Sequence, residues 1–295
     1  MVRVSVIMPT FNCAVYIGEA IESALNQTYK DFEIVIVDDG STDNTEEVVR
    51  RYIFSTQVMI KYIRQFNSGP AVARNKAISE SRGEFLALLD ADDIWLPDRL
   101  KEGLASFEAN PDVGLIHSDT LRIDEKGDFL PKPRRNVRLS SGNIFNSLML
   151  RKVHISCPTV LLRRAALDKV GLFDENPQCR GVEDRDLWLR ITKEYKVFFI
   201  DKILAHYRIR KNSISRDPEK MAVSKIYVIN KFYPENGVSF FRNRAIAQVC
   251  RESADDLLIR GEFVLARAYY RKAVALWPFL FWCWVNLAKT FSKGR

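Results

Sequence analysis

The sequence contains few cysteines, glycines and prolines, and these shortages exclude several classes of protein. Among 295 residues there are 5 cysteines, 13 glycines and 11 prolines. The glycine and proline content is too low for a collagen-like or low-complexity chain. The cysteine count is odd, and no two cysteines form a Cys-x-x-Cys pair. We therefore expect reduced thiols in a cytoplasmic protein, because disulfides persist mainly in oxidising compartments.

Long apolar runs are also lacking. Residues 273–288 are nearly all apolar, but this run has 16 residues and contains Pro278, whereas a helix that spans a bilayer needs about 20. The apolar run before Pro9 is too short for a signal peptide. We therefore expect no membrane-spanning helix and no export from the cytoplasm.

Positive charge is concentrated toward the C-terminus. Residues 1–200 carry 27 basic and 29 acidic side chains, whereas residues 201–295 carry 18 and 8. The net charge is therefore −2 in the first part and +10 in the second, within a chain of net charge +8. The negative first part argues against nucleic-acid binding. The cationic end favours contact with membrane phospholipid or with a polyphosphate substrate.

Short apolar, β-branched segments alternate with segments of helical spacing. The expected strands are residues 3–8, 32–37, 58–63 and 84–89. Four strand-helix units in succession predict a doubly wound α/β sheet. In such a sheet ligands bind beyond the carboxyl ends of the strands, so we expect the chemistry to lie there.

The first two expected strands end in residues that suit a nucleotide. Pro9 and Phe11 stand at the first end, and Asp38 and Asp39 stand at the second. An aspartate can accept hydrogen bonds from a base N–H or a ribose hydroxyl, and an aromatic ring can stack on the base. Alternatively, Asp38, Asp39 and Gly40 form only a turn that caps the next helix.

Three carboxylates, those of Asp90, Asp92 and Asp93, follow the fourth expected strand. They repel one another, and a divalent cation with oxygen ligands is the usual way to offset such charge. That cation could clamp a diphosphate, and Arg74 would suit the same phosphates. The alternative is an acidic loop that caps the next helix and an ordinary exposed arginine.

Glu183 and Asp184 begin a segment of helical spacing, residues 183–194. Carboxylates in the first turn of a helix complement its dipole, and this structural explanation accounts for both residues equally well.

Together these segments resemble the inverting family 2 glycosyltransferases of the GT-A fold. The matching segments are residues 4–12, 37–43 and 67–75, the Asp90-x-Asp92 motif, residues 170–175 and Glu183-Asp184. The resemblance implies a Rossmann-like mixed sheet flanked by helices. It also implies metal-dependent transfer of a sugar, with inversion, from a nucleoside-diphosphate sugar to a hydroxyl acceptor.

The resemblance further implies roles for individual residues. The donor-binding residues would be Pro9, Phe11, Asp39, Asn67, Arg74 and Asp90. Asp92 would hold Mg²⁺ or Mn²⁺ on the diphosphate, and Asp184 would be the general base that takes the proton of the acceptor hydroxyl. A UDP-sugar is the favoured donor. A lipid-linked glycan of polysaccharide or glycolipid assembly is a candidate acceptor.

One position departs from the family pattern. Residues 207–215 resemble the flexible C-terminal loop of the family, but Arg210 stands where that loop often has histidine. We therefore assign no third metal ligand. Instead, Arg208, Arg210 and Lys211 are candidate contacts of the diphosphate, because arginine and lysine are fixed cations at neutral pH.

We expect a catalytic domain over residues 1–215 and a helical extension over residues 216–295. Trp277, Trp282 and Trp284, with flanking cations, suit a helix that lies on the inner face of the cell membrane. A helix hairpin that packs back on residues 237–272 explains the same sequence equally well.

Two other functions are weighed against a glycosyltransferase. A nucleotidyltransferase would share the nucleotide-binding sheet and the metal carboxylates, but its glycine- and basic-rich N-terminal loop is missing. A catalytically inactive adaptor, bound through the tail to a membrane or a protein, is the alternative from another class. Intact Asp92 and Asp184 argue against an inactive domain.

Overall fold

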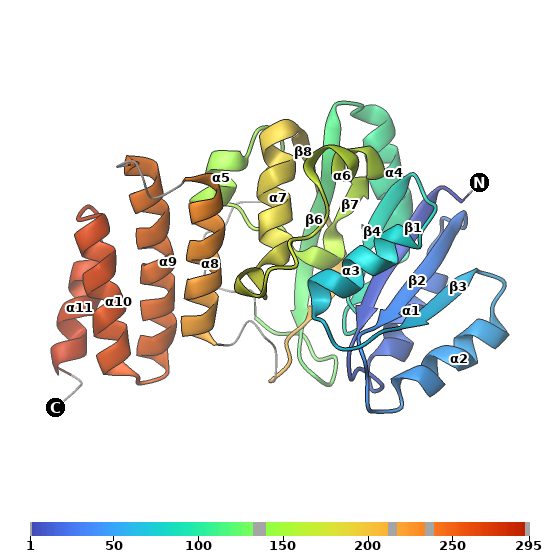
Figure 1. Ribbon diagram of the computed structural model, residues 1–295, viewed down its shortest axis with the longest axis horizontal. Helices are drawn as coiled ribbons and strands as arrows, with labels where there is room; N and C mark the ends of the chain where they lie inside the picture. Colours follow the sequence, from blue (N-terminus) through green and yellow to red (C-terminus); the bar gives the residue numbers. More distant parts are fainter. Residues whose placement is uncertain (1, 132–139, 212–216, 234–238, 293–295) are drawn as a thin grey trace. The chain divides into compact units, whose positions relative to one another are not determined.

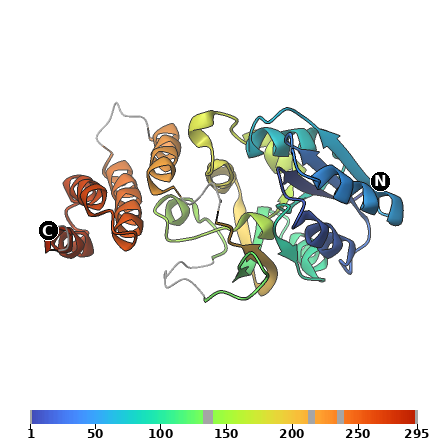
Figure 2. The same cartoon turned by 90° about the horizontal axis from the view of Figure 1, so that it is seen from below.

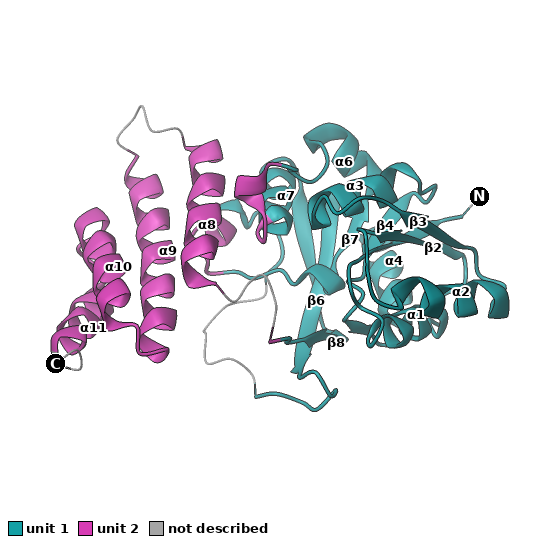
Figure 3. Cartoon of the chain, turned by 60° about the horizontal axis from the view of Figure 1, so that its bottom comes forward, with its two compact units in different colours: residues 1–145, 153–175, 183–210 teal, residues 146–152, 176–182, 211–295 magenta. Residues whose placement is uncertain are grey.

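The computed structural model describes residues 2–131, 140–211, 217–233 and 239–292. The chain divides into two compact units, which Figure 3 colours separately. Unit 1 comprises residues 1–145, 153–175 and 183–210, and unit 2 comprises residues 146–152, 176–182 and 211–295. The expected domain boundary between residues 215 and 216 lies outside the described residues and stays a prediction.

Unit 1 is built on an eight-stranded mixed sheet (Figure 1). In chain order its strands are β1 (Val4–Thr10), β2 (Phe32–Asp38), β3 (Ile60–Arg64), β4 (Phe85–Leu88), β5 (Ile94–Trp95), β6 (Val113–Ile123), β7 (Leu161–Arg163) and β8 (Lys196–Arg208). Their order across the sheet is β3-β2-β1-β4-β7-β6-β8-β5. The first four strands in this order are parallel, β7 is antiparallel to β4 and β6, β6 and β8 are parallel, and β5 is antiparallel to β8. The α/β class and the mixed sheet expected from the sequence are confirmed.

Helices cover both faces of this sheet. The helices of unit 1 are α1 (Ile17–Leu25), α2 (Thr45–Ser55), α3 (Pro70–Ser79), α4 (Arg99–Ala109), α6 (Arg164–Val170) and α7 (Glu183–Glu194), with the 3₁₀ turn η1 (Cys157–Thr159). Helix α5 (Phe145–Met149), apart from its first residue, and the 3₁₀ turn η2 (Pro177–Cys179) belong to unit 2. Figure 3 shows α3 and α6 on one face, and α1, α2 and α4 on the other.

The central strands are mostly apolar because both of their faces are buried, and their few polar side chains are buried as well. On one face, Val4, Val6 and Met8 of β1 join Ile17 and Ile21 of α1 in the main hydrophobic cluster, and all five side chains are fully buried. The three-to-four spacing of the α1 residues is the reason that they share one face of the helix. This packing holds the carboxyl ends of β1, β2 and β4 at one edge of the sheet.

Strand β8 is longer than the sequence indicates. The apolar pattern predicts a strand only over residues 197–200, whereas β8 runs from Lys196 to Arg208. It follows β6 through several shifts of register, and its second half also pairs with β5. Tyr207 and Arg208 therefore lie in the sheet, so the prediction of a flexible loop that begins at Tyr207 is wrong. Residues 212–215 of that expected loop lie outside the described residues.

Unit 2 continues into helices that stand side by side, as Figure 2 shows from below. They are α8 (Pro218–Phe232), α9 (Phe240–Ile259), α10 (Phe263–Leu276) and α11 (Phe281–Ser292). Asp217 caps α8 by accepting hydrogen bonds from the N–H groups of Glu219 (3.1 Å) and Lys220 (3.0 Å). Such caps satisfy N–H groups that the helix itself leaves unpaired.

Helices α9, α10 and α11 share a buried interior. The side chains of Cys250, Tyr270 and Cys283 are fully buried, and the Tyr270 hydroxyl donates a hydrogen bond to Oδ1 of Asp255 (2.6 Å). The packing of α10 and α11 is that of the expected helix hairpin. Among the described residues, no helix combines the length and the apolar character needed to cross a membrane. All five cysteines are buried free thiols.

Candidate functional site

Hydrogen bonds between two loops join the carboxyl ends of β1 and β2. Asn12, which has a positive φ of 49°, accepts a hydrogen bond at Oδ1 from the N–H of Thr42 (2.8 Å). The N–H of Asn12 in turn donates to Oγ of Ser41 (2.9 Å). Ser41 also donates its N–H to Oδ1 of Asp38 (2.7 Å). Asp38 therefore forms a turn, which is the alternative to nucleotide binding considered for this residue.

Pro9 and Phe11, predicted to hold the base and ribose, lie at the carboxyl end of β1. Pro9 is half-buried and pairs with Val37 of β2. The side chain of Phe11 is 45% exposed, which is unusual for a large aromatic residue beside a buried strand. An exposed ring at this edge is available to stack on a planar base.

Asp39 is buried at the end of β2 and is surrounded by donors. Its Oδ1 accepts hydrogen bonds from Nε2 of Gln65 and the N–H of Ser68, and its Oδ2 accepts one from the N–H of Gly69, each at 2.8 Å. Hydrogen bonds to an ionised acceptor are the stronger ones in proteins. Asp39 thus fixes the loop that leads into α3.

Asn67 lies exposed in this same loop. Its backbone nitrogen is 3.1 Å from the point where a Cβ atom on Gly40 would stand, and Gly40 has a φ of +82°. A larger residue at position 40 would be strained and would displace the loop. The structure therefore brings Asp39 and Asn67 together, and their role in donor binding stays a prediction.

Arg74 is buried on α3 and bridges two carboxylates from other parts of the chain. Its Nη2 donates to Oδ1 of Asp90 (2.7 Å), and its Nη1 donates to Oε1 of Glu183 (2.8 Å). Burial lowers the pKa of Arg74, but the carboxylates outweigh this effect and hold it well above its usual value. Its guanidinium also lies 5.5 Å from the centre of the Phe173 ring. The predicted donor residues Arg74 and Asp90 are therefore in contact.

Asp92 and Arg210 form an ion pair at the edge of the same cluster. Nη1 of Arg210 lies 3.2 Å from Oδ2 of Asp92, and the two side chains are 27% and 24% exposed. The same nitrogen lies 3.2 Å from Sγ of Cys13, and the guanidinium lies 5.1 Å from the centre of the Tyr16 ring. Burial and the nearby Asp90 raise the pKa of Asp92, while Arg210 lowers it.

Arg208 is buried and makes its contacts with the protein itself. Its N–H donates to Oδ1 of Asp93 (2.8 Å), its Nε donates to the carbonyl of Asp92 (2.8 Å), and its Nη2 pairs with Glu19. These bonds hold the acidic loop against β8. A diphosphate contact by Arg208 stays a prediction, as does one by Lys211, which is exposed and begins the last segment of unit 2.

The acidic cluster fits a divalent cation. Asp90 and Asp92 offer hard carboxylate oxygens, and Oδ2 of Asp93 is buried with no hydrogen-bond partner among the described residues. Burial and the two neighbouring carboxylates raise the pKa of Asp93 well above its usual value. Mg²⁺ and Mn²⁺ prefer such oxygen ligands and would offset this repulsion.

Asp184 lies in the first turn of α7, next to Glu183. Its Oδ1 accepts a hydrogen bond from the N–H of Arg185 (2.6 Å). Burial and the charge of Glu183 raise the pKa of Asp184 to about 6, although Arg74 lowers it. A carboxylate with this pKa is ionised at pH 7 and is more basic than an ordinary aspartate. These properties suit a general base.

Asn75, the neighbour of Arg74, has a structural role that the sequence did not indicate. Its Nδ2 donates to the carbonyl of Phe173 (2.9 Å) and to Oε1 of Glu175 (2.8 Å), and its Oδ1 accepts a hydrogen bond from the N–H of Phe173 (2.9 Å). Asn75 therefore holds the segment after α6 against α3. Asn75 and Phe173 are 98 positions apart in the sequence, so no spacing pattern could indicate their contact.

Tyr207 is a second residue that the sequence did not single out. Burial and the charges of four carboxylates, those of Asp93, Asp90, Asp92 and Asp184, raise the pKa of its hydroxyl above its usual value. The phenol is therefore a neutral donor within the field of the acidic cluster.

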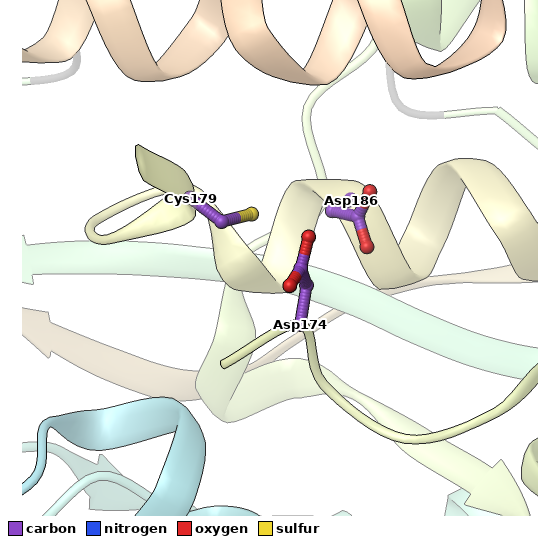
Figure 4. A group of neighbouring side chains, drawn as sticks. All are labelled: Asp174, Cys179 and Asp186. Atoms are coloured by element: carbon purple, nitrogen blue, oxygen red, sulfur yellow. The ribbon is translucent and has the colours of Figure 1, made fainter. Parts of the chain in front are cut away.

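A further pair of carboxylates lies beside α7. Asp186 of α7 and Asp174 of the segment after α6 each offer an oxygen within 4.8 Å of the other (Figure 4). Oδ2 of Asp186 accepts a hydrogen bond from Nε of Arg190 (2.9 Å), whose Nη2 donates to the carbonyl of Leu172 (2.6 Å). Arg190 therefore offsets charge here and fastens the segment to α7.

The fold and the site define an α/β protein of the GT-A type, with carboxylates and arginines gathered at the carboxyl ends of its strands. The sequence family "Glycosyl transferase family 2" matches residues 5–171, more than half of the chain. The chain belongs to this family. Membership removes the support for a nucleotidyltransferase.

Several curated relatives are similar in sequence. An uncharacterized glycosyltransferase of Rickettsia conorii is 36% identical over 252 residues, which are 84% of this chain and 40% of the relative. The chain thus spans about two fifths of the length of this relative. TuaG of Bacillus subtilis, whose name assigns it to teichuronic acid biosynthesis, is 30% identical over 227 residues, 76% of this chain and 86% of that protein.

Solved structures share the fold. Residues 1–349 of TarS from S. aureus, in complex with UDP-GlcNAc, match with a TM-score of 0.66 and 19% identity, over 98% of this chain and 89% of the TarS fragment. The mannosyltransferase PcManGT of Pyrobaculum calidifontis, in complex with GDP-Man and Mn²⁺, matches with a TM-score of 0.65 and 21% identity, over 98% of this chain and 79% of that protein. These likenesses concern the fold.

Proposed function

We propose that the chain is a metal-dependent, inverting glycosyltransferase that moves a sugar from a nucleoside-diphosphate sugar to a hydroxyl acceptor. The observation that carries the proposal is the convergence of Arg74, Asp90 and Glu183: a buried ion pair joins Arg74 to Glu183, 109 positions away, and a partly buried one joins it to Asp90. Asp92 follows Asp90, and Asp184 follows Glu183, so the convergence brings a candidate metal ligand and a candidate base to one site.

Each residue of the proposed site has its own role in the reaction. A bound Mg²⁺ or Mn²⁺ would stabilise the charge that develops on the leaving diphosphate. Asp184 takes the proton of the acceptor hydroxyl while the acceptor oxygen bonds to the anomeric carbon and the bond to the diphosphate breaks. Attack from the face opposite the diphosphate inverts the anomeric configuration. Arg74 fixes the carboxylate of Asp90 beside the donor.

The donor and the pathway are proposed from the relatives. TarS with UDP-GlcNAc favours a UDP-sugar, and PcManGT with GDP-Man and Mn²⁺ supports use of a divalent cation. The name of TuaG supports a role in polysaccharide assembly, where lipid-linked glycans would serve as acceptors.

Calorimetry tests the donor site directly. We expect UDP to bind in the presence of Mn²⁺ and to bind much more weakly in excess chelator, because the acidic cluster needs a cation before it can hold a diphosphate. GDP, dTDP and CDP, titrated in the same way, define the base preference. Absence of binding by all four nucleotides would contradict the proposal and favour an inactive adaptor.

We also propose that unit 2 contacts the inner face of the cell membrane. Around the turn between α10 and α11, Phe279, Phe281 and Trp282 are 79%, 70% and 69% exposed. The chain carries a net +10 over residues 201–295. Exposed aromatic side chains and nearby cations are typical of helices that lie in the headgroup region of anionic membranes.

Co-sedimentation with vesicles that contain phosphatidylglycerol measures this contact. We expect the chain to bind at low salt and the double variant F281S/W282S to bind about tenfold more weakly, because it removes two exposed apolar anchors. F54S is the matched control, since Phe54 is 83% exposed on α2 of unit 1. An equal loss in F54S, or no binding of the unaltered chain, would exclude the proposed surface.

A further inference from the structure

Arg210 forms an ion pair with Asp92, the carboxylate that the proposed function assigns to the metal. Its Nη1 lies 3.2 Å from Oδ2 of Asp92. The backbone leading to it is fixed, because the N–H of Ile209 donates to the carbonyl of Ile123 (2.8 Å). The side chain also lies over the ring of Tyr16. The fold therefore holds the backbone of Arg210 at the site, and Tyr16 packs against its side chain.

The other arginines of the site are engaged elsewhere. Arg74 is bonded to Asp90 and Glu183, and Arg208 donates to the carbonyl of Asp92 and pairs with Glu19. Among the described side chains, Arg210 is the cation that the structure pairs with the carboxylate of Asp92.

This pair is more accessible to solvent than the other arginine pairs of the site. About a quarter of each side chain is exposed, in contrast to Arg74 and Arg208, which are nearly fully buried. Arg210 also follows the last residue of β8 by two positions, so its side chain is not confined within the sheet. A partly exposed ion pair exchanges its partner for a ligand more readily than a fully buried one, because less of the freed charge is left without solvent.

We propose that Arg210 is an exchangeable counter-ion: it neutralises Asp92 in the donor-free protein, and it transfers to the diphosphate when cation and nucleotide bind. This inference rests on the proposed function. A guanidinium and a divalent cation compete for one carboxylate, so Arg210 weakens binding of the cation alone. Once Asp92 is taken by the cation, the freed guanidinium faces the diphosphate, for which it is a good bidentate donor.

The proposal requires that Arg210 couple the two ligands. In thermodynamic terms, cation and nucleotide each raise the affinity for the other, and Arg210 supplies part of that coupling. A residue that acted only through structure would weaken both binding steps. An exchangeable counter-ion instead affects them in opposite directions.

The test compares R210Q with the unaltered chain in two measurements. The first is binding of Mn²⁺ alone, followed by the electron paramagnetic resonance signal of free Mn²⁺. The second is binding of UDP at saturating Mn²⁺, measured by calorimetry. We expect R210Q to bind Mn²⁺ about fivefold more tightly, because the competing pair is lost. We expect it to bind UDP about tenfold more weakly, because a charge-assisted contact is lost.

Two further variants serve as references. R51Q makes the same change in an exposed ion pair with Glu47 on α2, and neither binding step should change. R210K retains the positive charge, so Mn²⁺ binding should stay near that of the unaltered chain. This variant also keeps the test decisive if R210Q folds poorly, because tighter Mn²⁺ binding by R210K would overturn the proposal.

The outcomes separate this proposal from the proposed function. If the unaltered chain binds no nucleotide with Mn²⁺, the proposed function itself fails. If it does bind UDP, but R210Q leaves Mn²⁺ affinity unchanged or lowers it, the counter-ion exchange is wrong while the donor site stands. Unchanged UDP affinity in R210Q overturns the exchange in the same way.

Discussion

Asp184→Asn should bind donor as tightly as the unaltered chain and transfer sugar about a thousandfold more slowly. General bases contribute roughly a hundred- to ten-thousandfold to rate, and an amide cannot take the acceptor proton. The proposed donor and metal contacts are those of Arg74, Asp90 and Asp92, which this change leaves in place. Steady-state transfer to acceptor and calorimetric binding of UDP with Mn²⁺ measure the two quantities separately.

The pH profile gives an independent readout of the same residue. Because the pKa of Asp184 is raised to about 6, kcat/KM should increase as pH rises through about 6 and level off above about 7. D184N should lose this rise.

The stability of D184N should not fall. The pKa of Asp184 is higher in the folded protein, about 6, than in the unfolded chain, about 4. The protein therefore loses stability as pH rises from about 4 to about 6, and the ionised form of Asp184 opposes folding at pH 7. Asp112→Asn, at an exposed ion pair with Lys196, is the matched control. Transfer by D184N at the unaltered rate would rule out Asp184 as the base.

Asp92→Ala is expected to abolish the effect of the cation on nucleotide binding. Removal of a ligand should cost at least about a hundredfold in affinity for Mn²⁺, since even changes behind the ligands cost roughly ten- to a hundredfold. UDP should then bind equally weakly with Mn²⁺ and with chelator. Calorimetry under both conditions measures the difference.

The folded state should tolerate the Asp92→Ala change. Burial and Asp90 raise the pKa of Asp92, so the charge of Asp92 opposes folding at neutral pH and its removal relieves repulsion. Thermal unfolding should therefore show no loss of stability, and Asp112→Ala is again the exposed control. Mn²⁺-enhanced UDP binding that survived in D92A would refute the assignment of Asp92 as a metal ligand.

Much of unit 1 could be predicted because its signals are local. The runs at β1 and β2 are apolar because both faces of each strand are buried, and α1 places Ile17 and Ile21 on one face by helical spacing. The end of β8 could not be predicted in this way. Its second half mixes charged and apolar residues without a clear strand pattern, and it is a strand because β6 and β5 pair with it, which is a property of the sheet.

The candidate site could likewise be predicted only in part from the sequence. The sequence by itself determined that carboxylates follow β4 and begin α7, since these positions depend on short motifs and on local strand and helix patterns. Only the tertiary structure decided which arginine meets which carboxylate. Arg74 and Glu183 are 109 positions apart, and Asp92 and Arg210 are 118 apart. Such pairs form because the order of strands in the sheet brings distant loops to one edge, and Coulomb attraction acts over a few ångströms of space, whatever the separation along the chain.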